Sequence, residues 1–356
     1  MNPSTHPRLS FSPIHRLLTS DDNSSTSFSD EENRVLLIIT VAESVLSLIG
    51  SVLIVTSYLK FKRLRKFSLE LVFWLSISDI GMCVSYFFGN PESGYLCTAQ
   101  AMIMSFFELA SVLWTTVIAL TLFRLIILQR TSSHLIKYYH IFCFGLPFIS
   151  MFLPLITDSY GNSGAWCWIT TPSDDDESDK EIMESAGNIW RLTLFYLPLW
   201  LAIIFNSTVY VIVTKTLSRV ASTQASDQRP KYLKMIRRLR LYPLILVFCW
   251  LGATINRIQN VLDPSAPQYY LYLYQVATRS LQGTLNALVY GFNNHVIGEW
   301  LSIIPNGCSF NASKEEESSS GGEEDEEDGI FNKVSYVGGK VGGGERDSND
   351  MERSLI

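Results

Sequence analysis

VLLIITVAESVLSLIGSVLIVTSYL occupies residues 35–59, and the basic sequence KFKRLRK follows at residues 60–66. The first stretch is long enough to cross a membrane, because a helix needs about 20 apolar residues to span a hydrocarbon core of about 30 Å. The second is a short loop rich in lysine and arginine, which is typical of the cytoplasmic side of a membrane protein. Together they predict a membrane-spanning helix followed by a cytoplasmic loop.

Six more apolar stretches of similar length follow this one. The seven stretches are residues 35–59, 68–89, 98–128, 138–156, 189–213, 241–262 and 269–292. Their apolar residues are continuous rather than alternating, which indicates helices and argues against a membrane β-barrel. The sequence therefore predicts an all-α membrane protein with a seven-transmembrane helix bundle at residues 35–292.

The loops between these stretches differ in their content of lysine and arginine. The loops and helix ends on one side contain 16 such residues, whereas the loops on the other side contain one, Lys180. Because basic loops stay in the cytoplasm, we expect an extracellular N-terminus and a cytoplasmic C-terminus. The expected localisation is the plasma membrane, as a multi-pass protein whose basic loops contact membrane lipids.

The composition agrees with one membrane domain that has polar ends. Of the 356 residues, 47% are hydrophobic and only 17% are charged, whereas soluble domains contain about 25% charged residues. The net charge of −6 comes from local acidic segments, and nothing indicates nucleic acid as a partner. The five histidines lie in the tails or near the inner surface, so we expect no metal site, no cofactor and no enzymatic activity.

The segments outside the bundle are polar. Residues 1–34 lack the apolar core of a signal peptide and predict a disordered extracellular tail. In this tail Asn23 begins an Asn-Ser-Ser sequon, which is either a glycosylation site or unused.

The chain after the last apolar stretch divides into two parts. Residues 293–305 predict an amphipathic helix at the membrane interface, and residues 306–356 predict a disordered acidic cytoplasmic tail. Cys308, between them, is either palmitoylated or a plain reduced thiol. Serines beside acids make the tail a candidate substrate for an acid-directed kinase, and the alternative is a merely solvated acidic segment.

Four of the six cysteines fall in predicted helices or on the inner side, where thiols stay reduced. The other two are Cys97, at the outer end of the third stretch, and Cys167, in the second outer loop. A disulfide between them is favoured over two free thiols, and it would cover the outer opening of the bundle. Trp166 and Trp168 flank Cys167 and are therefore candidates for the lining of a ligand pocket.

Ionisable residues inside the apolar stretches are functional candidates, because a charge inside a membrane is costly. Counting about 1.5 Å per residue places Glu108 and Arg279 both about 15 Å below the outer surface, where they could form a buried pair. Such a pair is either a lock that a ligand or a proton opens, or a static link between helices. Arg257 lies only about 8 Å down, and it either faces an entering ligand or extends outward to the headgroups.

Other polar residues also lie within the stretches. Asp79 reaches a midplane depth from the inner side, similar to that of Glu108 and Arg279. Asn206, Asn256 and Asn286 are expected to bridge neighbouring helices rather than to contact a ligand.

Several blocks of sequence have a recognisable pattern. They are LRKFSLELVFWLSISD at residues 64–79, SVLWTT at 111–116, AWCW at 165–168, FYLPLW at 195–200 and NALVYGFN at 286–293. In these and further blocks, over roughly residues 35 to 300, the chain resembles the slime-mould cyclic AMP receptors and their plant G-protein-coupled-receptor-like relatives. The resemblance implies a receptor that senses an extracellular ligand and signals, by rearranging its helices, to the α subunit of a heterotrimeric G protein.

The resemblance also implies roles for single residues. It carries the disulfide over to Cys97 and Cys167, whereas Glu108 and Arg279 are not part of the family pattern. The arginine at the inner end of helix three, which meets the G protein in related receptors, corresponds to Arg124, although the adjacent acid of rhodopsin-like receptors is missing here. The candidates for activation and coupling are Asp79, Arg124, Asn286, Tyr290, Lys234, Arg237 and Arg238.

Two other classes of function stay open. One is a membrane transporter or channel, against which stand the odd number of helices and the lack of an internal repeat or of short broken helices. The other is a scaffold with a receptor fold but without G-protein coupling. Cyclic AMP is disfavoured as the ligand, because an anion would first meet the acidic outer loop at residues 174–179.

Overall fold

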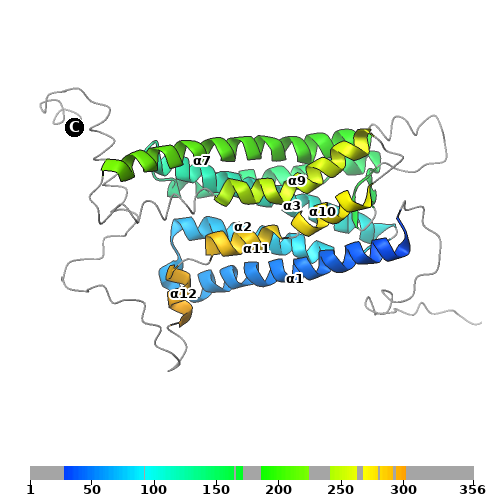
Figure 1. Cartoon of the computed structure of the whole chain (residues 1–356), viewed down its shortest axis with the longest axis horizontal. Helices are drawn as coiled ribbons and strands as arrows, with labels where there is room; N and C mark the ends of the chain where they lie inside the picture. The colour runs from blue at the N-terminus through cyan, green and yellow to red at the C-terminus, as the bar shows by residue number, and fades with distance from the viewer. Residues whose placement is uncertain are drawn as a thin grey trace, which may run out of the picture.

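The computed structural model describes residues 28–91, 93–163, 166–170, 186–223, 241–262, 268–279, 281–291 and 294–301. The described chain is mostly helical, and its long helices run along a common axis (Figure 1). Five of its helical segments are long and apolar enough to cross a membrane: Glu31–Lys60, Phe67–Tyr86, Tyr95–Ile126, Ser133–Thr157 and Ala186–Ser222. These segments coincide with the first five predicted stretches.

Helices also occupy the last two predicted stretches. Helix α9 (Leu241–Leu262) has the predicted bounds. The seventh stretch is instead divided into α10 (Tyr269–Arg279), α11 (Gln282–Asn286) and the π-helical turn η7 (Ala287–Gly291). The expectation that the chain has no short broken helix is therefore wrong.

The division of this last segment places α11 against α1 (Asp30–Lys60) and α2 (Phe67–Tyr86). A Cβ atom added at Gly283 would clash with the Ser47 hydroxyl. It would also lie 3.1 Å from the Ser51 Oγ and 3.3 Å from the Asp79 Cβ. The missing side chain therefore allows the backbone of α11 to approach both neighbouring helices.

Gly283→Ala should destabilise the protein by about 1–3 kcal/mol, the usual cost of adding a methyl group to a packed core. Gly298→Ala in α12 (Asn294–Leu301) is the matched control, because its Cβ would meet no atom within 4 Å. That control should be neutral or gain up to about 1 kcal/mol from helix propensity. Thermal unfolding of the two purified variants measures the difference, and equal melting temperatures would contradict the close approach of α11 to α1.

Helix α1 begins earlier than predicted. Ser29 and Glu32 form a capping box, in which the Ser29 Oγ accepts from the Glu32 backbone N–H and the Glu32 carboxylate accepts from the Ser29 N–H. This arrangement satisfies free N–H groups of the first turn. Residues 30–34, which the sequence placed in a disordered tail, are therefore helical.

Two prolines each follow a widened helical turn. The fourth segment runs through η3 (Ser133–Leu135), α4 (Ile136–His140), η4 (Ile141–Gly145), α5 (Leu146–Ser150) and η5 (Leu153–Thr157). The fifth includes η6 (Leu192–Tyr196) and α7 (Leu197–Thr223). Pro147 follows the π turn η4, and Pro198 follows the π turn η6. A proline lacks an N–H and clashes with the carbonyl four residues earlier, and a π turn at that point accommodates both effects.

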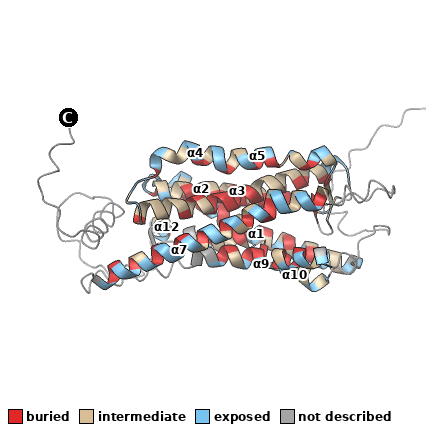
Figure 2. Ribbon diagram, turned by 90° about the horizontal axis from the view of Figure 1, so that it is seen from above, coloured by how far each residue is buried: buried red, intermediate tan, exposed pale blue. Residues whose placement is uncertain are grey.

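Helix α3 (Tyr95–Ile126) lies among the other helices and carries much of the buried surface (Figure 2). Large apolar side chains instead face outward on the surrounding helices, such as Ile49 on α1, Ile149 on α5 and Ile204 on α7, which are 56%, 63% and 63% exposed. Soluble proteins rarely present continuous apolar faces of this kind. The outward surface is therefore suited to lipid.

Candidate functional site

A short hairpin covers the end of the bundle that the sequence predicts to be extracellular, which is called the outer end here. Strands β1 (Tyr160–Asn162) and β2 (Cys167–Ile169) pair antiparallel, with Gly161 opposite Trp168. A disulfide joins Cys167 to Cys97 in the first turn of α3, with 5.2 Å between their Cα atoms. The structure thus links the two cysteines that the sequence singled out.

Gln100 also binds the same hairpin, through a hydrogen bond to Cys167. Its side-chain oxygen accepts from the Cys167 backbone N–H at 3.1 Å. Its amide nitrogen donates to the carbonyls of Ser85, at 3.1 Å in the last turn of α2, and Gly89, at 2.9 Å just beyond that helix. Sequence reasoning missed this residue, although its position three residues after Cys97 places it on the same face of α3.

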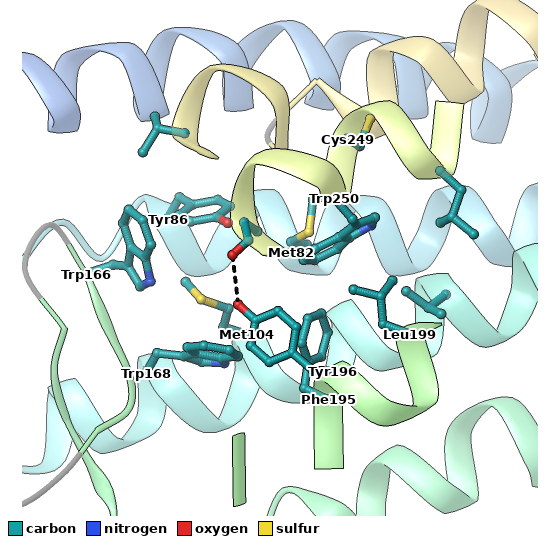
Figure 3. Packing of buried hydrophobic residues seen from close by; sticks show 14 of the residues in the cluster. Met82, Tyr86, Met104, Trp166, Trp168, Phe195, Tyr196, Leu199, Cys249 and Trp250 are labelled. Atoms are coloured by element: carbon teal, nitrogen blue, oxygen red, sulfur yellow. Dashed lines mark hydrogen bonds between the residues drawn. The ribbon is translucent and has the colours of Figure 1, made fainter. Parts of the chain in front are cut away.

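Trp166 and Trp168 point from the hairpin into the bundle and are each only 2% exposed (Figure 3). The Trp166 ring lies 6.4 Å from that of Tyr86, and the Trp168 ring lies 5.6 Å from that of Phe195. Their indole N–H groups are buried and have no acceptor among the described residues. The two tryptophans therefore fill the outer part of the core, where the sequence placed a ligand pocket.

Glu108 on α3 and Arg279 at the end of α10 form an ion pair beneath these tryptophans. Their side chains are 0% and 3% exposed. Neither carboxylate oxygen of Glu108 accepts a hydrogen bond from another described residue. The predicted pairing of the two charges is present, and Arg279 is the main electrostatic partner of a fully buried carboxylate.

Four aromatic rings surround the Arg279 guanidinium. Its central carbon lies 5.4–5.9 Å from the ring centres of Trp250, Trp166, Trp168 and Tyr86. A cation near the face of an aromatic ring is stabilised by about 0.5–2 kcal/mol, depending on its burial. We call these four rings the aromatic cage. Because two of them come from the hairpin, the cage connects the outer loop directly to the ion pair.

Arg257 on α9 also contacts the hairpin. Its guanidinium lies 5.4 Å from the Trp168 ring centre and donates to the Ser163 hydroxyl at 3.4 Å. The residue is 8% exposed, so the side chain is turned inward. The alternative in which Arg257 extends to the headgroups is wrong, because Trp168 and Ser163 provide partners inside the protein.

A chain of buried hydrogen bonds continues from the cage toward the inner half of the bundle. The Trp250 indole donates to the Gln282 oxygen at 2.8 Å, and the Gln282 amide donates to the Ser111 hydroxyl at 2.9 Å. Ser111 in turn donates to Asp79 at 2.7 Å, and Asn286 donates to the other Asp79 oxygen at 3.0 Å. We call this the polar chain, and it links α9, α11, α3 and α2.

The predicted helix-bridging role of the asparagines is seen at two of the three positions, whereas the buried side-chain oxygen of Asn206 on α7 accepts no hydrogen bond from the described residues. Asn286 reaches Asp79 from α11, and Asn256 on α9 donates to the Gln275 side chain on α10 at 2.6 Å. Buried amides in membrane proteins commonly hydrogen-bond across helices in this way.

Arg124 lies at the opposite end of α3 from the hairpin. Its Nε donates to the Ser132 hydroxyl at 2.9 Å, and the Arg130 N–H donates to the Arg124 carbonyl at 3.0 Å. A shallow, open depression here is lined by Arg124, Gln129, Arg130, Thr131 and His134. Within the described residues the arginine is thus held by a loop serine, which agrees with the missing acid at position 123.

Several predicted site residues lie outside the part that the structure describes. They are Asn23, Lys234, Arg237, Arg238 and Cys308. Tyr290 belongs to η7, but its side chain is not described. In the described ranges no group of three or more His, Cys, Asp or Glu side chains is placed to hold a metal ion.

The chain is similar to several known receptors. The family described as slime mold cyclic AMP receptor matches residues 26–304. G-protein coupled receptor 1 of Arabidopsis thaliana is 34% identical over 74% of this chain and 80% of its own length. Cyclic AMP receptor-like protein A of Dictyostelium discoideum is 31% identical over 77% of this chain and 69% of its own. G-protein coupled receptor 157 of Mus musculus is 24% identical over 69% and 78%.

Proposed function

Because the chain belongs to the slime mold cyclic AMP receptor family, we propose that it is a G-protein-coupled receptor for an extracellular ligand. The family is one of receptors rather than enzymes. In this proposal seven helical segments cross the plasma membrane, with the N-terminus outside and the C-terminus in the cytosol. The bias of lysine and arginine toward one set of loops supports this orientation.

One observation carries the proposal. A continuous series of buried contacts runs from the outer hairpin through the aromatic cage to the polar chain. Trp250 belongs to both the cage and the polar chain. Trp250 lies 5.4 Å from Arg279 and donates to Gln282. A displacement of the hairpin therefore changes the surroundings of Arg279 and Trp250 first, and the hydrogen bonds of Gln282, Ser111 and Asp79 next.

We propose that the arrangement described above is the resting state. Trp166 and Trp168 cover the ion pair, and their unpaired, buried indole N–H groups become available to a ligand with hydrogen-bond acceptors once the hairpin is displaced. A ligand that binds better when the hairpin is displaced shifts the population toward that state, since only differential affinity moves such an equilibrium. Loss of the contacts of Arg279 would then loosen α10 from α3 and expose the inner end of α3 to the G protein.

Arg124 is proposed to meet the G protein after this change. It lies at the inner end of α3, and its hydrogen bond to Ser132 lies beside an open depression. The guanidinium is charged and the Ser132 hydroxyl is not, so this bond contributes about 1.5–3 kcal/mol, and an acceptor on a partner protein can provide an equivalent bond. Arg124 can therefore exchange Ser132 for a partner protein at little cost.

Nucleotide exchange on a purified heterotrimeric G protein tests the proposal, with the receptor held in lipid discs. We expect exchange that depends on the receptor, and we expect Arg124→Ala to lower it at least about tenfold, which corresponds to one charge-assisted hydrogen bond. Lys137→Ala removes an exposed base from the same end of the bundle and should leave the rate unchanged.

A scaffold without G-protein coupling would give a different result in the nucleotide-exchange experiment. If the folded receptor produces no exchange, either as wild type or after loosening of the hairpin by Trp168→Ala, a scaffold would replace the coupled receptor as the better proposal. Equal exchange with Arg124→Ala and Lys137→Ala would leave coupling intact but remove Arg124 from it.

A further inference from the structure

The inner end of α1 and the helix α12 form one fixed corner of the molecule. The Trp300 indole on α12 donates to the Ser57 hydroxyl on α1 at 2.8 Å. The ring of Trp300 also packs edge-on against Phe61 at 5.5 Å, and the Lys60 ammonium lies 4.8 Å from the Trp300 ring centre. Figure 1 shows α12 lying crosswise at the end of α1. These contacts hold α12 in a defined orientation.

This corner carries a dense group of exposed bases. They are Lys60, Lys62, Arg63, Arg65 and Lys66, in and around the turn η2 (Lys62–Leu64). Arg65 donates to the Leu59 carbonyl at 2.6 Å and to the Tyr58 carbonyl at 3.3 Å, which fixes the loop against the end of α1. The bases therefore stand on an ordered backbone.

The acids near these bases are too few to neutralise them. Among the described residues of this corner they are Glu70, in the first turn of α2, and Glu299 on α12. Arg63 lies 3.9 Å from Glu299, but its side chain is 89% exposed. Ion pairs of such exposed side chains contribute little and exchange partners readily. Within the described residues this corner is therefore net positive, which favours an anionic group.

Exposed apolar side chains flank the bases. Leu59 on α1 is 55% exposed, and Ile297 and Leu301 on α12 are 41% and 56% exposed. A soluble anion would use the bases alone and would leave this apolar surface uncovered. A phospholipid presents a phosphate directly beside its acyl chains, and an interfacial helix lies at the depth where these two parts meet.

We propose that this corner is a binding site for an anionic phospholipid. The headgroup phosphates lie against the bases of η2, and the acyl chains lie along Leu59, Ile297 and Leu301. With the orientation proposed above, this lipid belongs to the inner leaflet. The choice of leaflet rests on the proposed function, whereas the binding site does not. Headgroups with several phosphates should bind more tightly than headgroups with one, because more than one exposed base lies at the site.

Native mass spectrometry of the full-length protein, released from lipid discs, tests the site. The discs contain phosphatidylcholine with a minor share of phosphatidylinositol 4,5-bisphosphate. Lys62→Gln with Arg63→Gln should weaken retention of the bisphosphate lipid about 30-fold, since each base near an anionic surface contributes about 1 kcal/mol. Lys215→Gln with Arg219→Gln is the matched control, because it removes two exposed bases from α7 and should leave retention unchanged.

Two further arms separate the alternatives. Trp300→Leu keeps every base but loosens α12, so it should also lower retention, and lipid binding unaffected by it would overturn the role of α12. Soluble inositol trisphosphate should compete poorly. If it binds as tightly as the lipid, or if both double variants lose lipid equally, the corner is not a phospholipid site. No arm needs a G protein, so failure here is independent of failure in nucleotide exchange.

Discussion

Arg279→Gln should destabilise the protein by about 3–5 kcal/mol, the usual cost of removing one partner of a buried ion pair. The change leaves the Glu108 carboxylate buried, and no other described residue donates a hydrogen bond to it. Glu108→Gln should cost less, because the guanidinium left behind is still surrounded by the aromatic cage. Thermal unfolding of the purified variants in lipid discs measures this order.

The double variant supplies the control. With both charges removed, no uncompensated charge is left, so the loss for Glu108→Gln with Arg279→Gln should be smaller than the sum of the two single losses. Additive losses would mean that the two side chains do not interact. A larger loss for Glu108→Gln than for Arg279→Gln would contradict the stabilising role of the cage.

The ion pair could be predicted from the sequence because both partners are rare in apolar stretches and a helix rises by a fixed distance per residue. The cage could not be predicted in the same way. Trp166 and Trp168 come from a hairpin, and the register that pairs Gly161 with Trp168 decides which way each indole points. That register depends on the disulfide and on Gln100, which lie on another element.

The polar chain shows a different limit. Asp79 and Asn286 stood out in the sequence, but Ser111, Gln282 and Trp250 did not, since neutral polar residues are common in membrane helices. Ser111 and Gln282 are 171 residues apart, and Gln282 begins the second of the helices into which the last segment is divided. Apolar length predicts that a helix occupies this stretch, but it contains no information on such a break.

The break and the cage belong to one arrangement. Arg279 ends α10 and meets the cage, whereas Gln282 begins α11 and meets the polar chain. Trp250 contacts both residues from α9. Residues three positions apart lie on the same face of a helix, so one indole on α9 can contact both.

Trp168→Ala should have two effects. Removing a fully buried tryptophan should destabilise the protein by about 3–5 kcal/mol. It should also raise basal nucleotide exchange on the G protein about tenfold. The contacts of the Trp168 ring with Arg257 and Arg279 stabilise the proposed resting state only, so their loss destabilises that state relative to the active one. A difference of about 1.4 kcal/mol between the two states, within the range of one or two cation–π contacts, corresponds to that factor.

Trp190→Ala separates these two effects. Trp190 also lies near the outer end of the bundle and donates to Thr157, but it is not part of the cage. Its removal should lower the melting temperature without raising exchange per folded receptor. If Trp168→Ala behaves in the same way as Trp190→Ala, the hairpin is a structural cover. If only Trp168→Ala raises exchange, the resting state is held by the indole above Arg279, and a ligand need only displace that ring to begin activation.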